Sequence, residues 1–192
     1  MEHSTKFFNL SLKEVDVRSE DQRIIQGWAT RPEPDRMGDI VIPEGAQFQL
    51  PLPFLLDHDT AKSVGHVEEV KTLKEGIQFT ARIQKVDGDS SVARQCENAW
   101  MLIKHGLRRF VSIGFRTLES VFNEATDGLI ITKWEWLELS AVTIPALASA
   151  EITSAKSLAG LDTGAVSLLP QRSRSMIHHP DSVFLISKEI AK

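Results

Sequence analysis

A serine and a glycine stand together in a short segment whose alternation predicts a strand. Within residues 109–115 the apolar side chains share one face, whereas Ser112 and Gly114 share the other. A hydroxyl directed away from the apolar face is a candidate nucleophile, and the glycine leaves room for a substrate backbone beside it. The same pattern is also typical of an ordinary half-buried strand serine next to a β-bulge, and the segment alone favours that second interpretation.

A histidine stands where an apolar run ends and a charged cluster begins. His58 follows the apolar residues 54–56 and lies between Asp57 and Asp59. Imidazole has an ordinary pKa of about 6.5, which makes it the side chain best suited to accept a proton from a serine hydroxyl near neutral pH. The segment is equally typical of a solvated turn between strands, in which the two aspartates only raise the affinity of the histidine for a proton.

A single carboxylate interrupts a segment that is apolar on both faces. From residue 137 to residue 144 the only charged side chain is that of Glu138. Burial of a carboxylate is unfavourable unless it is paired or hydrogen-bonded, so we expect a specific partner for it. A protonated imidazole is one candidate. A structural ion pair with Arg108, Arg109 or Arg116 is the other.

The segments that carry these residues belong to a chain rich in strand patterns. Alternation is clearest over residues 77–83, and weaker patterns cover residues 7–17, 23–30, 64–70, 109–118 and 129–144. One helix is expected between Asp89 or Ser90, as N-cap, and Gly106, as C-terminal stop. We therefore expect an α+β protein in which antiparallel β-structure predominates.

Two segments lack this periodicity. Residues 31–53 contain five prolines and are expected to form a long loop, of a kind that is often functional. After Pro145 small residues predominate, without strand alternation. We expect one main domain over residues 1–150 and a flexible C-terminal tail over residues 151–192.

Composition narrows the classes of protein to consider. With 192 residues and 42% hydrophobic content, the chain is long enough for one sizeable core. Its net charge of −4 gives no basic field, so we expect neither a nucleic acid nor a membrane as partner. The single cysteine, Cys96, excludes an intramolecular disulfide and a zinc site built from several thiolates. No signal-peptide pattern or bilayer-spanning apolar stretch is evident, so we expect a soluble protein that stays in the compartment where it is made.

Taken in order, several of these segments resemble the prohead serine proteases of tailed bacteriophages, a family related in fold to the herpesvirus maturation proteases. The resemblance covers most of residues 5–150. The matching elements are Gln26-Gly27-Trp28-Ala29, Gly38-Asp39-Ile40-Val41, Leu56-Asp57-His58-Asp59, Val64-Gly65, Val111-Ser112-Ile113-Gly114-Phe115 and Leu137-Glu138-Leu139-Ser140-Ala141-Val142-Thr143-Ile144-Pro145-Ala146.

The resemblance implies a serine endopeptidase of the Ser-His-Glu type, with Ser112 as nucleophile, His58 as general base and Glu138 as the third catalytic member. It implies a β-barrel-like core with a few flanking helices, and the chemistry requires no metal or organic cofactor. The implied substrate is a scaffolding protein, or the scaffolding segment of the major capsid protein, cleaved in the host cytoplasm inside the immature viral capsid. Self-cleavage is common in the family, which makes the tail over residues 151–192 a candidate for processing.

Two positions depart from the family pattern: Asp57 stands where many relatives have a neutral polar residue, and Leu147 where Asn usually follows Pro-Ala. Herpesvirus relatives pair their serine with two histidines, a role that would need His66 or His105 here. His66 has a mixed strand pattern and His105 ends the predicted helix, where a cation is favourable without catalysis. Glu138 is therefore the preferred third member.

A second class of function fits the same fold. A non-catalytic scaffolding or capsid-docking protein would act by binding coat protein, but it would have no need for a serine, a histidine and a buried carboxylate together. A β-barrel binding protein unrelated to phages is a third interpretation. The sequence is compatible with a homo-oligomer and does not fix the oligomeric state.

Overall fold

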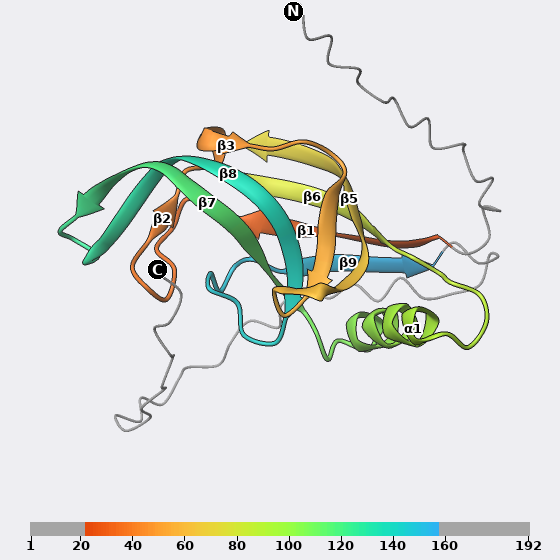
Figure 1. Ribbon diagram of the computed structural model, residues 1–192. Coiled ribbons are helices and arrows are strands. Elements are labelled where there is room, and N and C mark those ends of the chain that lie inside the picture. Colours follow the sequence, from red (N-terminus) through yellow and green to blue (C-terminus); the bar gives the residue numbers. More distant parts are fainter. Residues whose placement is uncertain (1–21, 158–192) are drawn as a thin grey trace, which may run out of the picture.

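Strands make up most of the part of the chain that the structure describes, residues 22–157 of this computed structural model (Figure 1). They form one nine-stranded sheet. The elements in chain order are β1 (Arg23–Thr30), β2 (Ile40–Val41), the 3₁₀ helix η2 (Pro43–Gly45), β3 (Ala46–Gln47), β4 (Leu52–Leu56), β5 (Asp59–Leu73), β6 (Gly76–Ile83), α1 (Ser91–Lys104), β7 (Phe110–Asn123), β8 (Gly128–Val142) and β9 (Ile152–Ser157). Every predicted strand from residue 23 onward is confirmed. The strand predicted at residues 7–17 lies outside the described residues.

Strand β8 is the centre of the sheet. Its full length pairs with β7 in an antiparallel ladder that runs from Phe110 opposite Val142 to Asn123 opposite Gly128. Its other edge carries three short parallel partners in succession, β2, β3 and β4. The sheet then continues through antiparallel pairs from β4 to β5, β6, β1 and β9. The long ladders are antiparallel as expected, but the parallel partners of β8 make the sheet mixed.

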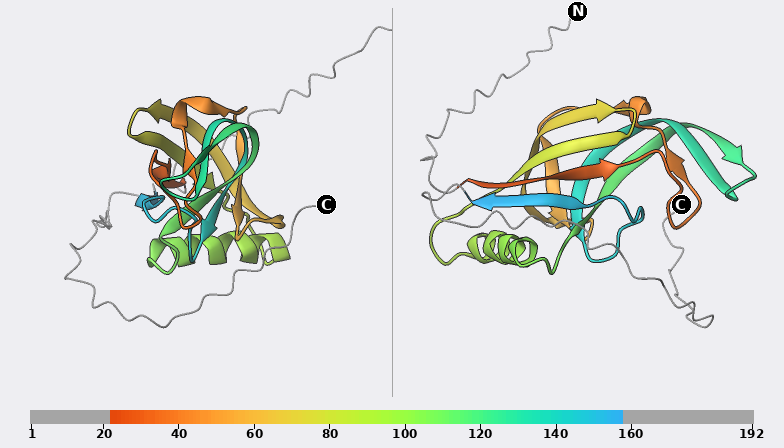
Figure 2. Two further views of the ribbon diagram at one scale, coloured as in Figure 1. Left: turned by 90° about the vertical axis from the view of Figure 1, so that its left-hand side faces the viewer. Right: turned by 180° about the vertical axis from the view of Figure 1, so that it is seen from behind.

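The implied barrel-like core with a few flanking helices is present only in part, because no strand ladder closes the sheet. The first residue of β7, Phe110, forms only an isolated bridge, with Glu151 immediately before β9. Farther along β7 the hairpin projects beyond the rest of the sheet, so its outer edge has no ladder partner within residues 22–157 (Figures 1 and 2). Within that part of the chain α1 is the one α-helix, and no helix there is long and apolar enough to cross a membrane.

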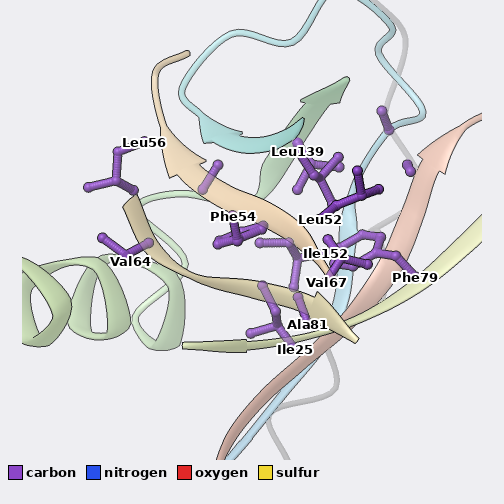
Figure 3. Packing of buried hydrophobic residues seen from close by; sticks show 14 of the residues in the cluster. Ile25, Leu52, Phe54, Leu56, Val64, Val67, Phe79, Ala81, Leu139 and Ile152 are labelled. Atoms are coloured by element: carbon purple, nitrogen blue, oxygen red, sulfur yellow. The ribbon is translucent and has the colours of Figure 1, made fainter. Parts of the chain in front are cut away.

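The core lies inside the curve of the sheet and under α1. Side chains from eight strands converge there, among them Ile25, Phe54, Val67, Phe79 and Leu139 (Figure 3). The helix begins as predicted, because the Ser90 hydroxyl accepts a hydrogen bond from the backbone N–H of Ala93 at 3.0 Å. Its apolar stripe, which includes Cys96, Ala99, Trp100 and Ile103, is buried against the sheet.

The long loop expected over residues 31–53 is partly wrong, because the segment contains β2, η2 and β3 and the start of β4. Strands of two residues leave no periodicity to detect, and here they form only because the edge of β8 is available to pair with them. Asp39 fixes the segment further by accepting a hydrogen bond from the backbone N–H of Leu129 at 2.7 Å.

The sheet also continues past the domain boundary expected at residue 150, because β9 pairs with β1. Residues 158–192, the larger part of the expected tail, lie outside the described residues.

Candidate active site

The β7–β8 ladder places the predicted nucleophile on the same face of the sheet as the predicted acid. Ser112 lies opposite Ser140, and Gly114 lies opposite Glu138. Residues directly opposite one another in an antiparallel pair present their side chains on the same face. The alternation that put Ser112 and Gly114 on one face therefore also brings Glu138 and Ser140 to it.

His58 reaches this face from a tight turn. Asp57 and His58 link β4 to β5 with φ values of 54° and 57°, so both lie in the left-handed region. A two-residue hairpin loop with two positive φ values matches the right-handed twist of its strands, and Asp and His are among the residues that adopt this conformation most readily. Because Leu55 pairs with Ser140 and Leu56 with Ala141, the turn ends beside the end of β8 that carries Glu138.

The imidazole of His58 and the carboxylate of Glu138 form a direct hydrogen bond. Nδ1 of His58 lies 2.6 Å from Oε1 of Glu138, and the two side chains are 43% and 13% exposed. This bond raises the pKa of His58 above its ordinary value of 6.5, against the opposing effect of partial burial. The expected partner of the strand carboxylate is thus the histidine, while Arg108 pairs with Asp57 and Arg116 with Glu135.

Ser140 belongs to this group, although the sequence did not single it out. Its hydroxyl donates a hydrogen bond to Oε2 of Glu138 at 2.8 Å and accepts one from the backbone N–H of His58 at 3.0 Å. The residue is wholly buried. It therefore holds the carboxylate and the histidine turn at the same time. Its position two residues after Glu138, on the same strand face, is the signal that could have identified it.

Gly114 makes room for the carboxylate rather than only for a substrate. A Cβ atom on residue 114 would lie 1.9 Å from Oε1 of Glu138 and 2.6 Å from its Cδ. Real Cβ atoms do not approach that closely, so any side chain here would displace Glu138 from His58.

An ion pair fixes the other side of the histidine turn. Arg108, in the connection between α1 and β7, donates to both carboxylate oxygens of Asp57, with a distance of 2.7 Å to Oδ2. It also donates to the backbone carbonyl oxygen of Ala141 at 2.9 Å. The guanidinium lowers the pKa of Asp57, so this carboxylate stays ionised as the partner of Arg108. The departure from the family pattern at Asp57 thus has a structural role.

Ser112 is 8% exposed and borders a cavity that Ile113, Phe115 and Leu147 also line. Among the described residues, the structure joins His58 to Glu138 but forms no hydrogen bond between Ser112 and His58. The other candidate histidines are elsewhere: His66 is exposed on β5, and His105 is the C-cap of α1. Within residues 22–157, no cluster of His, Cys, Asp and Glu is arranged to hold a metal ion.

Residues 9–163 match the sequence model of the family described as caudovirus prohead serine proteases. The chain belongs to this family. It is 45% identical over 148 residues to a capsid polyprotein of Pseudomonas phage PAJU2, and the match covers 77% of this chain and 22% of the polyprotein. It is 30% identical over 161 residues to the prohead protease of Escherichia phage T5, covering 79% of this chain and 72% of that protein.

The chain therefore spans about a fifth of the length of the polyprotein. Among solved structures, KSHV protease in complex with a hexapeptide phosphonate inhibitor aligns with a TM-score of 0.41 and 12% identity, over 69% of this chain and 64% of that one.

Proposed function

We propose that this protein is a serine endopeptidase of the Ser-His-Glu type, in which Ser112 is the nucleophile, His58 the general base and Glu138 the acid that orients it. The observation that supports this most directly is the hydrogen bond of 2.6 Å between Nδ1 of His58 and Oε1 of Glu138. It lies on the sheet face that carries Ser112, in a member of a serine protease family.

The hydrogen bond assigns separate tasks to the two ring nitrogens. With Nδ1 donating to Glu138, Nε2 is the nitrogen left to accept a proton from the Ser112 hydroxyl as it attacks a peptide carbonyl. The proton then passes to the leaving amine, and the acyl-enzyme is hydrolysed by water with the same base. Glu138 stabilises the imidazolium that forms in each half-reaction, and Ser140 restrains the carboxylate.

The substrate that we propose is the scaffolding protein, or the scaffolding segment of the major capsid protein, inside an immature capsid in the host cytoplasm. Family membership and the 45% identity to a region of a capsid polyprotein support this proposal. Self-cleavage is part of it. The removable tail would begin after β9, because Ile152–Ser157 is paired with β1.

A fluorophosphonate probe and a cleavage assay test the proposal together. The wild-type protein should be labelled at Ser112 and should process the coat or scaffolding protein that is co-expressed with it. Ser112→Ala should fold, lose the label and leave that partner and its own termini uncut, as judged by mass spectrometry. Ser120→Ala, an exposed serine on the same strand, is the matched control and should behave as wild type.

The competing function, a non-catalytic capsid-docking protein, predicts the opposite result. Such a protein would bind coat protein without being labelled, and Ser112→Ala would bind equally well. Cleavage that persists in Ser112→Ala would show that another residue is the nucleophile.

A further inference from the structure

A groove lies next to the proposed active site, separate from the cavity that Ser112 borders. It is an open groove of about 690 Å³ between the β3–β4 segment and the middle of the β7–β8 hairpin. Its lining includes Phe48, Pro53, Arg116, Leu118, Trp136 and Leu137. Apart from Trp136, whose indole Nε1 donates a hydrogen bond to the backbone carbonyl oxygen of Glu138 at 2.7 Å, these residues lie outside the Ser112, His58 and Glu138 arrangement.

Part of the groove lining, Arg116 and Glu135, lies on the face of the sheet that carries the proposed catalytic residues, whereas Trp136 lies opposite Phe115 on the other face. Along β7 the side chains of Ser112, Gly114 and Arg116 alternate to one face, and Arg116 lies opposite Glu135, with which it forms an ion pair of 2.6 Å. A polypeptide lying across Ser112 in extended form can therefore follow β7 directly into the groove.

Strand β4, on the other side of the groove, also leads to the proposed active site. On β4, Leu55 pairs with Ser140, and Pro53 lies two residues before it on the same face. Pro53 lines the groove, so β4 connects the groove to the strand position beside the carboxylate and the histidine turn.

Two leucines at ladder irregularities give the groove its apolar surface. On β7 the ladder pairs Thr117 and then Glu119, so Leu118 has no partner on β8. On β8 it pairs Glu138 and then Trp136, so Leu137 has no partner on β7. Such bulges redirect side chains, and these two are 40% and 49% exposed.

The base of the groove is firm, since Trp136 is 2% exposed and packs edge-on against Phe48 with ring centroids 5.5 Å apart. An apolar side chain entering the groove would therefore meet a rigid surface, with the two bulged leucines beside it.

We propose that this groove binds an extended segment of the polypeptide substrate and selects an apolar side chain about four residues from the scissile bond. The spacing follows from β7, where Arg116 lies four positions, or about 13 Å, from Ser112. This inference rests on the proposed protease function and adds a specificity determinant to it. Leu118 and Leu137 are specificity residues here and not catalytic ones.

The test compares cleavage of a long substrate with reaction at Ser112 alone. Leu118→Ser and Leu137→Ser should each raise KM for the co-expressed coat or scaffolding protein about 10-fold while kcat stays unchanged, because the contact is lost equally from ground and transition states. The rate of fluorophosphonate labelling should not change, since the small probe does not reach the groove. Leu73→Ser, which is also 40% exposed but lies at the β5–β6 turn, is the matched control.

Four other outcomes would overturn the inference. If both groove variants cleave like wild type, the groove has no role in substrate binding, while the proposed protease function stands. If they lose labelling as well, the groove acts through the catalytic residues. If they convert a wild-type dimer into a monomer on size-exclusion chromatography without changing KM, the groove binds a second copy of the chain. A wild-type protein that is neither labelled nor active would overturn the protease function and this inference together.

Discussion

The two ends of the β7–β8 hairpin share one ladder but differ in what surrounds it. At the end that carries Ser112 and Glu138, β4 pairs with the edge of β8 that faces away from β7. Residues 150–152 form backbone hydrogen bonds at the start of β7. At the other end, β7 is exposed from Arg116 to Phe122 and has no outer partner among the described residues. Figures 1 and 2 show this end projecting beyond the rest of the sheet.

The comparison suggests a physical reason for the position of the proposed catalytic side chains. A hydrogen bond between His58 and Glu138 needs two backbones held at a fixed separation, and only the supported end fixes both strands from two sides. The projecting end has the freedom that a binding surface tolerates and a catalytic hydrogen bond does not. Substitutions at the supported end should therefore lower kcat strongly, and the same kinds of substitution at the projecting end should leave kcat almost unchanged.

The largest expected effect is that of Glu138→Gln. The amide no longer stabilises the imidazolium, and we expect kcat to fall by about 10⁴-fold, as when a triad acid is replaced by its amide. Kinetics on a cleavable peptide, with folding checked by circular dichroism, measures the change. Glu119→Gln, on the projecting end, should behave as wild type. Activity near wild type in Glu138→Gln, together with loss of activity in His66→Ala or His105→Ala, would instead indicate a Ser-His-His arrangement.

The same variant should change the pH dependence in a defined direction. In the wild type the Glu138 hydrogen bond holds the pKa of His58 above 6.5, and only the neutral imidazole acts as a base, so kcat/KM falls as the pH drops through that raised pKa. Removing the carboxylate charge lowers the pKa of His58. The acidic limb of the profile should therefore move to lower pH, on a much lower plateau, and a limb that stays in place would show that Glu138 does not set it.

Gly114→Ala should reduce kcat by about 100-fold, since the new methyl group overlaps Oε1 of Glu138 and displaces the carboxylate from His58. The overlap should also lower the melting temperature. The double variant Gly114→Ala/Glu138→Ala removes the clash, so it should melt above Gly114→Ala while remaining inactive. A double variant no more stable than Gly114→Ala would show that the clash lies elsewhere.

A smaller loss is expected for Ser140→Ala, about 10-fold in kcat with KM unchanged. The variant keeps the hydrogen bond between His58 and Glu138 but frees the second carboxylate oxygen and the backbone N–H of His58. Peptide kinetics separates kcat from KM, and thermal melting shows whether the protein is still folded. An equal loss through KM would contradict a positioning role for Ser140.

The smallest effects concern stability, and two valines on β7 form a matched pair. Val111 is wholly buried at the supported end, so Val111→Ala should lower the free energy of unfolding by about 2 kcal/mol. Val121 is 56% exposed at the projecting end, and Val121→Ala should change it by less than about 0.5 kcal/mol. Urea denaturation of both variants measures the difference, and equal values would show that the two ends are equally supported.

Much of the fold follows from local pattern. Alternation identified β1, β6, β7 and β8, and the Ser90 cap together with the apolar stripe identified α1, because each element of this length carries its own periodicity. Alternation also placed Ser112 and Gly114 on one face. The sequence also predicted that Glu138 has a hydrogen-bond or ion-pair partner, since burial of a carboxylate among apolar residues is unfavourable without one.

Only the tertiary structure decided which partner Glu138 has. His58 precedes it by 80 positions, and the two meet because β4 adds in parallel to the edge of β8 and ends in a left-handed turn. Pairing with β8 also produces the short strands β2 and β3. It likewise brings the Glu138 carboxylate over Gly114 and allows the two side-chain hydrogen bonds of Ser140. Periodicity reports which face of a strand is buried. Which strands become neighbours, and therefore which side chains meet across them, depends on long-range pairing that no local pattern contains.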